Sequence, residues 1–287
     1  MKVTSLAKES LMDLKKNPIV LLPDVVYFFI IAIVNLLFYK IAKFGEMIEK
    51  FSLIQEQYVS DPSNIAQFGS FFANDWLKFI ISITIFVIIT FFIGVGFQAI
   101  KLLLIKSVIR KGDSGSLRLL VTKRKRKYYF KLAFVKFFVF LINVSLVIVI
   151  LALTLISNVL NITTPVKIIT IGLFAILLTV FIRLGLLYRY AVLFLSEKRK
   201  SRSAIINSFK FALDNGKHVF IIGAFVVFIG LIFGLLNLFF VRLLDLLVIE
   251  NILLISLFTF LIYMVGKVYN AWVDLVLFND YELKGKK

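Results

Sequence analysis

The sequence predicts an all-α polytopic membrane protein, with six transmembrane helices arranged as three hairpins and a cytoplasmic interfacial amphipathic helix before each hairpin. Three observations predict it. The chain of 287 residues is 61% hydrophobic and 17% charged, whereas a soluble domain is about half apolar and about a quarter charged. Its mean hydropathy is +0.98. These values are the first observation; the second is the presence of six long apolar stretches, and the third is a one-sided distribution of basic residues. This composition excludes a soluble enzyme domain and a disordered chain.

Each of the six stretches is long enough for a membrane span, which needs about 20 mostly apolar residues. Three of them, 79–100, 137–160 and 219–241, carry no charge. The other three carry one or two charged residues each: 19–39 contains Asp24, 168–195 contains Arg183 and Arg189, and 252–276 contains Lys267 and Asp274.

The orientation follows from the lysines and arginines, which favour the cytoplasmic side of a membrane protein. Of the 34 basic residues, 28 lie in the segments 1–16, 101–136, 183–217 and 267–287, and 6 lie in the opposite segments 40–78, 161–167 and 242–251. We therefore expect a multi-pass protein of the cell membrane with both termini in the cytoplasm. The net charge of +18 then reflects topology, and it requires no nucleic-acid partner.

Two segments that precede spans share a pattern. Segments 5–18 and 203–217 both have apolar residues at helical spacing, and when Ser10 is aligned with Ser208, Asn17 meets Asn215. Segment 116–131 has a similar layout. We expect one membrane domain, 1–287, built from units 1–100, 114–195 and 202–277; the alternative is that interfacial helices simply look alike. A further short helix is expected on the outer side at 41–59.

The stretch 189–223 carries a resemblance to a known family. An arginine and an aromatic residue end a span. A helical segment with Ala204, Ser208 and Leu213 follows, and it ends in a break at Gly216. The chain resembles the six-helix membrane domain of the glycerophosphoryl diester phosphodiesterase membrane-domain group, and it is similar to related uncharacterised prokaryotic membrane proteins. The resemblance implies a helical membrane domain. Some members add a catalytic phosphodiesterase domain, for which this chain has no room outside its spans, so that activity is not carried over.

Charged residues inside spans are costly without a partner and are therefore candidate functional residues. At a rise of about 1.5 Å per residue, Asp24, Arg183 and Lys267 reach similar depths in the inner half of the bilayer. They form a candidate charge cluster, which either binds an anionic lipid headgroup or a coupling ion, or is a structural pair with snorkelling side chains.

Two further patterns concern lipid contact and helix packing. A basic run beside a span attracts anionic lipid, at about 1 kcal/mol per residue near the surface, although such a run also simply sets topology. Glycines one or two turns apart allow helices to approach closely, within one chain or across a dimer. The candidate lipid contacts are Lys123, Arg124, Lys125, Arg126 and Lys127, and the candidate packing residues are Gly223, Gly230 and Gly234.

Nothing in the sequence indicates catalysis. The chain has no cysteine and one histidine, His218, so we expect no multi-histidine metal site, no cofactor and no enzyme activity. The favoured function is a non-catalytic scaffold or accessory domain that organises anionic membrane lipid or a partner protein. The alternatives are a small transporter or permease subunit that works with a separate ATPase subunit, a lipid-modifying membrane enzyme, and a simple channel.

Overall fold

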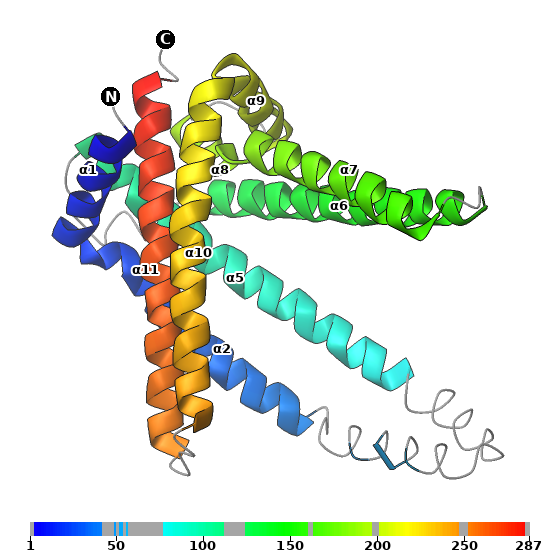
Figure 1. Cartoon of the computed structure of the whole chain (residues 1–287). Helices are drawn as coiled ribbons and strands as arrows, with labels where there is room; N and C mark the ends of the chain where they lie inside the picture. The colour runs from blue at the N-terminus through cyan, green and yellow to red at the C-terminus, as the bar shows by residue number, and fades with distance from the viewer. Residues whose placement is uncertain are drawn as a thin grey trace. The chain divides into compact units, whose positions relative to one another are not determined.

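The structure, a computed structural model (Figure 1), is helical throughout its described regular elements and contains six helices that are long and apolar enough to cross a membrane. It describes residues 3–41, 77–111, 124–159, 163–196, 201–246 and 252–284, together with residues 49, 52, 53 and 56. The predicted all-α polytopic architecture is confirmed. Most of the expected outer helix at 41–59 and all of the segment 116–123 lie outside the described residues.

The helices follow the six apolar stretches but are longer than most of them. Charged ends extend several helices beyond the apolar part, as at the basic start of α6. The elements are α1 (Val3–Lys16), the 3-10 turn η1 (Pro18–Leu21), α2 (Leu22–Ile41), α5 (Leu77–Lys111), α6 (Arg124–Val159), α7 (Thr164–Gly185), α8 (Arg189–Leu195), α9 (Ser201–Asp214), α10 (Gly216–Leu246) and α11 (Ile252–Lys284).

The fourth apolar stretch is interrupted near its end. Helix α7 ends at Gly185, and α8 begins at Arg189. The backbone N–H groups of Leu186 and Leu187 still bond to carbonyls one turn back, and Arg189 N donates to Leu186 O at 3.2 Å. A single turn therefore separates α7 from the short helix α8.

The chain divides into two compact units. In the unit Pro23–Phe97, helices α2 and α5 pair through aromatic side chains. The rings of Phe38 and Phe86 are 4.4 Å apart and those of Tyr27 and Phe97 are 5.8 Å apart, between centroids. The residue numbers rise on one helix as they fall on the other, so the two helices are antiparallel.

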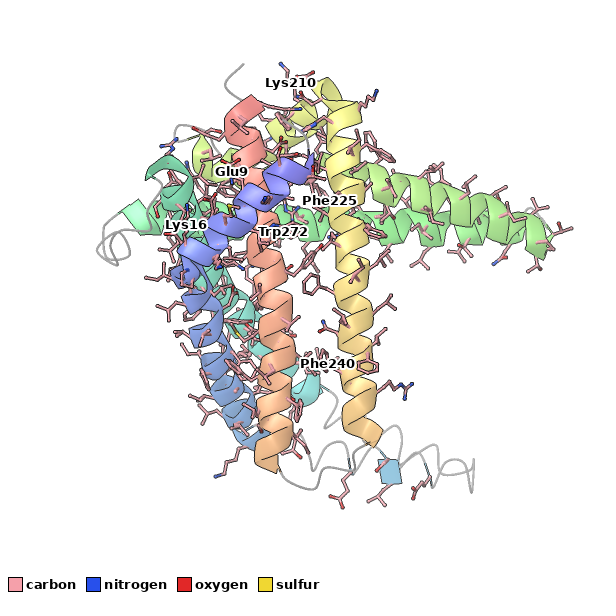
Figure 2. All side chains as sticks on the ribbon, turned by 60° about the vertical axis from the view of Figure 1, so that its left-hand side comes forward. Glu9, Lys16, Lys210, Phe225, Phe240 and Trp272 are labelled. Carbon is pink, nitrogen blue, oxygen red and sulfur yellow. The ribbon has the colours of Figure 1, made fainter. Side chains whose placement is uncertain are left out.

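The unit Met1–Leu22 with Gln98–Lys287 holds the remaining hairpins. Helices α6 and α7 run side by side, as do α10 and α11 (Figure 1). Phe225 of α10 and Trp272 of α11 face each other with ring centroids 6.0 Å apart (Figure 2). Tyr269 of α11 donates a hydrogen bond across the same hairpin to Val226 O at 2.7 Å.

Close packing in this unit is concentrated where the short helices meet the long ones. We call this region the packed end: α1, α8 and α9, with the adjoining parts of α5 from Gln98, the start of α6, the start of α10 and the end of α11. The fully buried large side chains include Leu102, Leu132, Tyr188, Phe194, Ile222 and Phe278. A fully buried apolar side chain of this size contributes about 1.5–3 kcal/mol.

The rest of the spans present apolar side chains to their surroundings. Leu36 on α2 is 71% exposed, Leu155 on α6 is 65% exposed and Leu235 on α10 is 66% exposed. Isolated exposed apolar residues are normal on a soluble protein, but continuous apolar surface along several helices is typical of a lipid-facing wall.

Candidate functional site at the packed end

A buried carboxylate joins three elements of the packed end. Asp280, near the end of α11, is 3% exposed. Its Oδ2 accepts a hydrogen bond of 2.6 Å from the hydroxyl of Tyr188, which lies between α7 and α8. Its Oδ1 is 2.8 Å from His218 Nε2, on the first turn of α10. Burial of a carboxylate is costly unless it is hydrogen-bonded, and both oxygens of Asp280 have partners.

These contacts are suited to holding helices together. The Tyr188 side chain is fully buried, with its ring 4.7 Å from the ring of Phe211 on α9. Hydrogen bonds to a charged group contribute about 1.5–3 kcal/mol each. The three side chains therefore fasten α10, α11 and the α7–α8 connection to one another, with α9 packed against the tyrosine.

Helix α9 reaches the end of α7 through Ser208. Its hydroxyl donates a hydrogen bond of 2.7 Å to Gly185 O, which is one of the carbonyls left without an intrahelical partner where α7 ends. Phe209 lies over the same glycine, so closely that a Cβ built on Gly185 would come within 2.2 Å of the phenylalanine ring. Gly185 is thus the residue that permits α9 to approach α7.

Helix α1 is attached to α11 in a comparable way. Trp272 Nε1 donates to Ala7 O at 3.0 Å, and Asn279 Nδ2 is 3.1 Å from Ser10 Oγ and 3.2 Å from Asp13 Oδ2. Figure 2 shows α1, which carries Glu9 and Lys16, crossing α11 beside Trp272. The apolar residues Leu6 and Leu14 are buried on this face.

The two short helices end alike. Asn17 Nδ2 donates to Asp13 O, and Asn215 Nδ2 donates to Phe211 O, each at 3.1 Å. The corresponding backbone N–H groups also donate to these two carbonyls, each at 3.0 Å. Ser10 and Ser208 are both fully buried. The residues that align in the sequence therefore have the same local roles.

A group of basic side chains lies in the same unit. The ammonium group of Lys136 on α6 interacts electrostatically with Lys267 on α11 and with Arg189 at the start of α8. Arg189 Nη1 donates to Leu186 O at 2.7 Å, and the guanidinium carbon lies 4.3 Å from the Tyr190 ring centroid. Lys267 Nζ lies 4.9 Å from the ring centroid of Tyr263. We call Lys136, Arg189 and Lys267 the basic cluster.

The sequence-predicted charge cluster is distributed over both units. Asp24 lies in the first turn of α2, in the Pro23–Phe97 unit, whereas Arg183 lies in the last turn of α7 and Lys267 on α11, both in the other unit. The association of these three residues stays a prediction. Within its own unit, Lys267 interacts with Lys136, which the sequence argument did not single out.

The remaining predicted residues have separate positions. Arg124, Lys125, Arg126 and Lys127 belong to the first turn of α6, and Lys123 lies outside the described residues. A Cβ on Gly223 would come within 2.4 Å of Leu184 on α7, and one on Gly230 within 2.8 Å of the Tyr269 hydroxyl on α11. Gly234 has open space around it. Gly223 and Gly230 thus pack within the chain, against different neighbours.

Sequence reasoning did not find Asp280 as the partner of His218. The two residues are 62 positions apart, and Asp280 lies beyond the end of the apolar stretch, where a carboxylate looks like a solvated residue. One available signal was the helical register of α11. Trp272 and Asn279 lie two turns apart on one face of the helix, which indicates that the helix continues beyond the apolar stretch. Among the described residues, no group of three metal-ligating side chains is close enough to hold a metal ion.

Comparison with known proteins gives no further guide to the site. No protein-family model, curated protein or solved structure matches this chain.

Proposed function

We propose that this chain is a non-catalytic integral membrane protein, a scaffold or accessory domain that organises anionic lipid or a partner protein at the cytoplasmic surface of the cell membrane. The observation that carries the proposal is the contrast between the packed end and the rest of the spans. The packed end is joined by buried polar contacts such as Tyr188–Asp280, whereas the spans beyond it expose apolar surface.

The arrangement suits an interfacial role. Helices α1 and α9 each have one face buried against the long helices, and each also exposes apolar residues on another face. Leu11 and Met12 are 55% and 48% exposed, and Ile206 and Leu213 are 55% and 67% exposed. Helices that carry exposed apolar residues together with basic ones lie in the plane of the membrane interface.

The distribution of charge supports the cytoplasmic side. The segments 1–16, 101–136, 183–217 and 267–287 hold 28 of the 34 basic residues, and the inner leaflet carries the anionic lipids that attract basic residues. The resemblance to the membrane-domain group agrees with this role, since it implies a helical membrane domain.

The test is native mass spectrometry of the chain extracted in mild detergent from its own membrane. We expect anionic phospholipid, or a partner protein, to stay bound after washing that removes zwitterionic lipid. Co-purification of an ATPase subunit would instead favour a transporter subunit. Recovery of the bare chain, without lipid or protein, would contradict the proposal.

A further inference from the structure

We propose that helix α7 closes along helix α10 within the bilayer, so that their contact at Leu184 and Gly223 extends over both spans as one seam. The starting contact is in the structure: a Cβ on Gly223 would overlap the side chain of Leu184, so the leucine lies in the hollow that the glycine leaves. Both helices belong to one compact unit and touch each other there. This inference goes beyond the proposed function and does not depend on it.

The two helices carry matching residues beyond this contact. Helix α7 ends near it and α10 begins near it, so the two chains run in opposite directions. Residues three and four positions apart share one face of a helix, and equal numbers of residues cover equal lengths, about 1.5 Å each. The pairs at equal distance from the contact are Leu184 with Gly223, Val180 with Val227, Leu177 with Gly230, Leu173 with Gly234, and Thr170 with Asn237. This alternating spacing is typical of antiparallel spans that pack side by side.

The shapes of these faces are complementary. Leu173 on α7 is 57% exposed, and a Cβ on Gly234 of α10 would have no atom of the described residues within 4 Å. Leu173 can therefore enter the hollow at Gly234 as Leu184 enters that at Gly223. Tyr269 of α11 lies beside Gly230, so α11 borders the seam at that level. Small residues in spans allow such a close approach of two helices.

The last pair of the seam is polar. Asn237 Oδ1 is buried and has no hydrogen-bond partner among the described residues. The hydroxyl of Thr170 is exposed and donates to Val166 O at 2.7 Å. In the closed arrangement this hydroxyl donates to Asn237 Oδ1 instead, which gives a buried acceptor in the bilayer its partner. A threonine and an asparagine thus meet at equal distance from the observed contact.

The end of α7 permits the movement. Both helices are long and apolar enough to cross a membrane, and spans are tilted by only about 20° on average, so two spans that touch at one end stay close along their length. Helix α7 ends at Gly185, and a single turn separates it from α8. Helix α7 can therefore change its tilt about this turn while α8 keeps its buried position.

Cysteine cross-linking in native membranes tests the closure, because the chain has no cysteine of its own. Leu173→Cys is combined with Gly234→Cys, each 11 positions from the observed contact. Oxidation should join the two cysteines within one chain, since a disulfide requires Cα atoms about 4.4–6.8 Å apart. Leu173→Cys with Leu236→Cys is the matched control. At about 3.6 residues per turn, Leu236 faces the opposite side of α10, and its cross-linking should be at least about tenfold lower.

Two further variants complete the test. Thr170→Cys with Asn237→Cys is a second pair in the same register, and it gives a result if the first pair does not accumulate in the membrane. Asn237→Leu, added to the first pair, should slow cross-linking about threefold, as the loss of one hydrogen bond between spans does.

The cross-linked product should migrate as a monomer on a denaturing gel. Disulfide-linked dimers in its place would mean that a second copy of the chain covers the Gly234 face, and this would overturn the closure. Cross-linking of neither in-register pair, or equal cross-linking with Leu236→Cys, would also overturn it. These results leave the proposed function unaffected, because that function is tested by the lipid or protein that stays bound to the extracted chain.

Discussion

At the scale of the residue, buried polar side chains account for how the packed end is held. Asp280 is buried, at 3% exposed, and both of its carboxylate oxygens have hydrogen-bond partners. Tyr188 and His218 come from elements on either side of α9 in the sequence. A single carboxylate thus joins the α7–α8 connection, the start of α10 and the end of α11.

Removal of the Tyr188 hydroxyl tests the contribution of its hydrogen bond to Asp280. We expect Tyr188→Phe to destabilise the detergent-solubilised protein by about 1.5–3 kcal/mol, because a buried hydrogen bond to a charged group is lost. Tyr39→Phe is the control, since Tyr39 on α2 is 59% exposed. Thermal denaturation followed by intrinsic fluorescence measures both. Equal melting temperatures for Tyr188→Phe and the parent chain would show that this hydrogen bond does not stabilise the protein.

At the scale of the element, the positions of the long helices could be predicted and the joints between them could not. Apolar length and the lack of charge predict α6 and α10, because a bilayer requires about 20 apolar residues whatever the helix contacts. The end of α7 at Gly185 depends instead on Ser208 and Phe209, which are more than 20 residues away. No local pattern contains that contact, so the stretch 168–195 looks like one span.

Glycine substitutions on α7 test this joint. Gly185→Ala should destabilise the protein, because the new Cβ would come within 2.2 Å of the Phe209 ring. Gly172→Ala, on the same helix with nothing within 4 Å, should be neutral or stabilising, by about 0.5–1 kcal/mol. A second change, Phe209→Ala, should recover part of the loss in Gly185→Ala. Thermal denaturation of the four proteins gives the comparison, and similar effects of the two alanines would refute the close approach of α9.

At the scale of the whole molecule, the sequence predicts the number of spans, which the structure confirms, and an orientation, which stays a prediction. It predicts the candidate site only in part. The prediction of Arg183 and Lys267 as site residues rested on their depth along single helices. Depth says nothing about the direction in which a side chain points. Lys136 precedes an uncharged stretch and so looked like a topological charge. Its relation to Lys267 appears only when α6 and α11 are placed together.

The orientation can be tested with single cysteines, because the chain has none of its own. Cysteines at Glu9 and Lys210, both exposed on the packed end, should react with a membrane-impermeant maleimide only after the cells are opened. A cysteine at Ser63, in the loop expected outside, should react in intact cells. Labelling of Glu9→Cys or Lys210→Cys in intact cells would reverse the topology and place the packed end outside.

The central claim is that anionic lipid gathers at the packed end, and the two tryptophans of the chain allow a direct measurement. Trp272 lies at the packed end, bonded to α1, and Trp76 is removed as Trp76→Phe. In vesicles with brominated acyl chains, brominated phosphatidylglycerol should quench Trp272 more strongly than brominated phosphatidylcholine at equal mole fraction. In Trp272→Phe, the remaining Trp76 should be quenched equally by both lipids. Equal quenching of Trp272 by the two lipids would contradict the account.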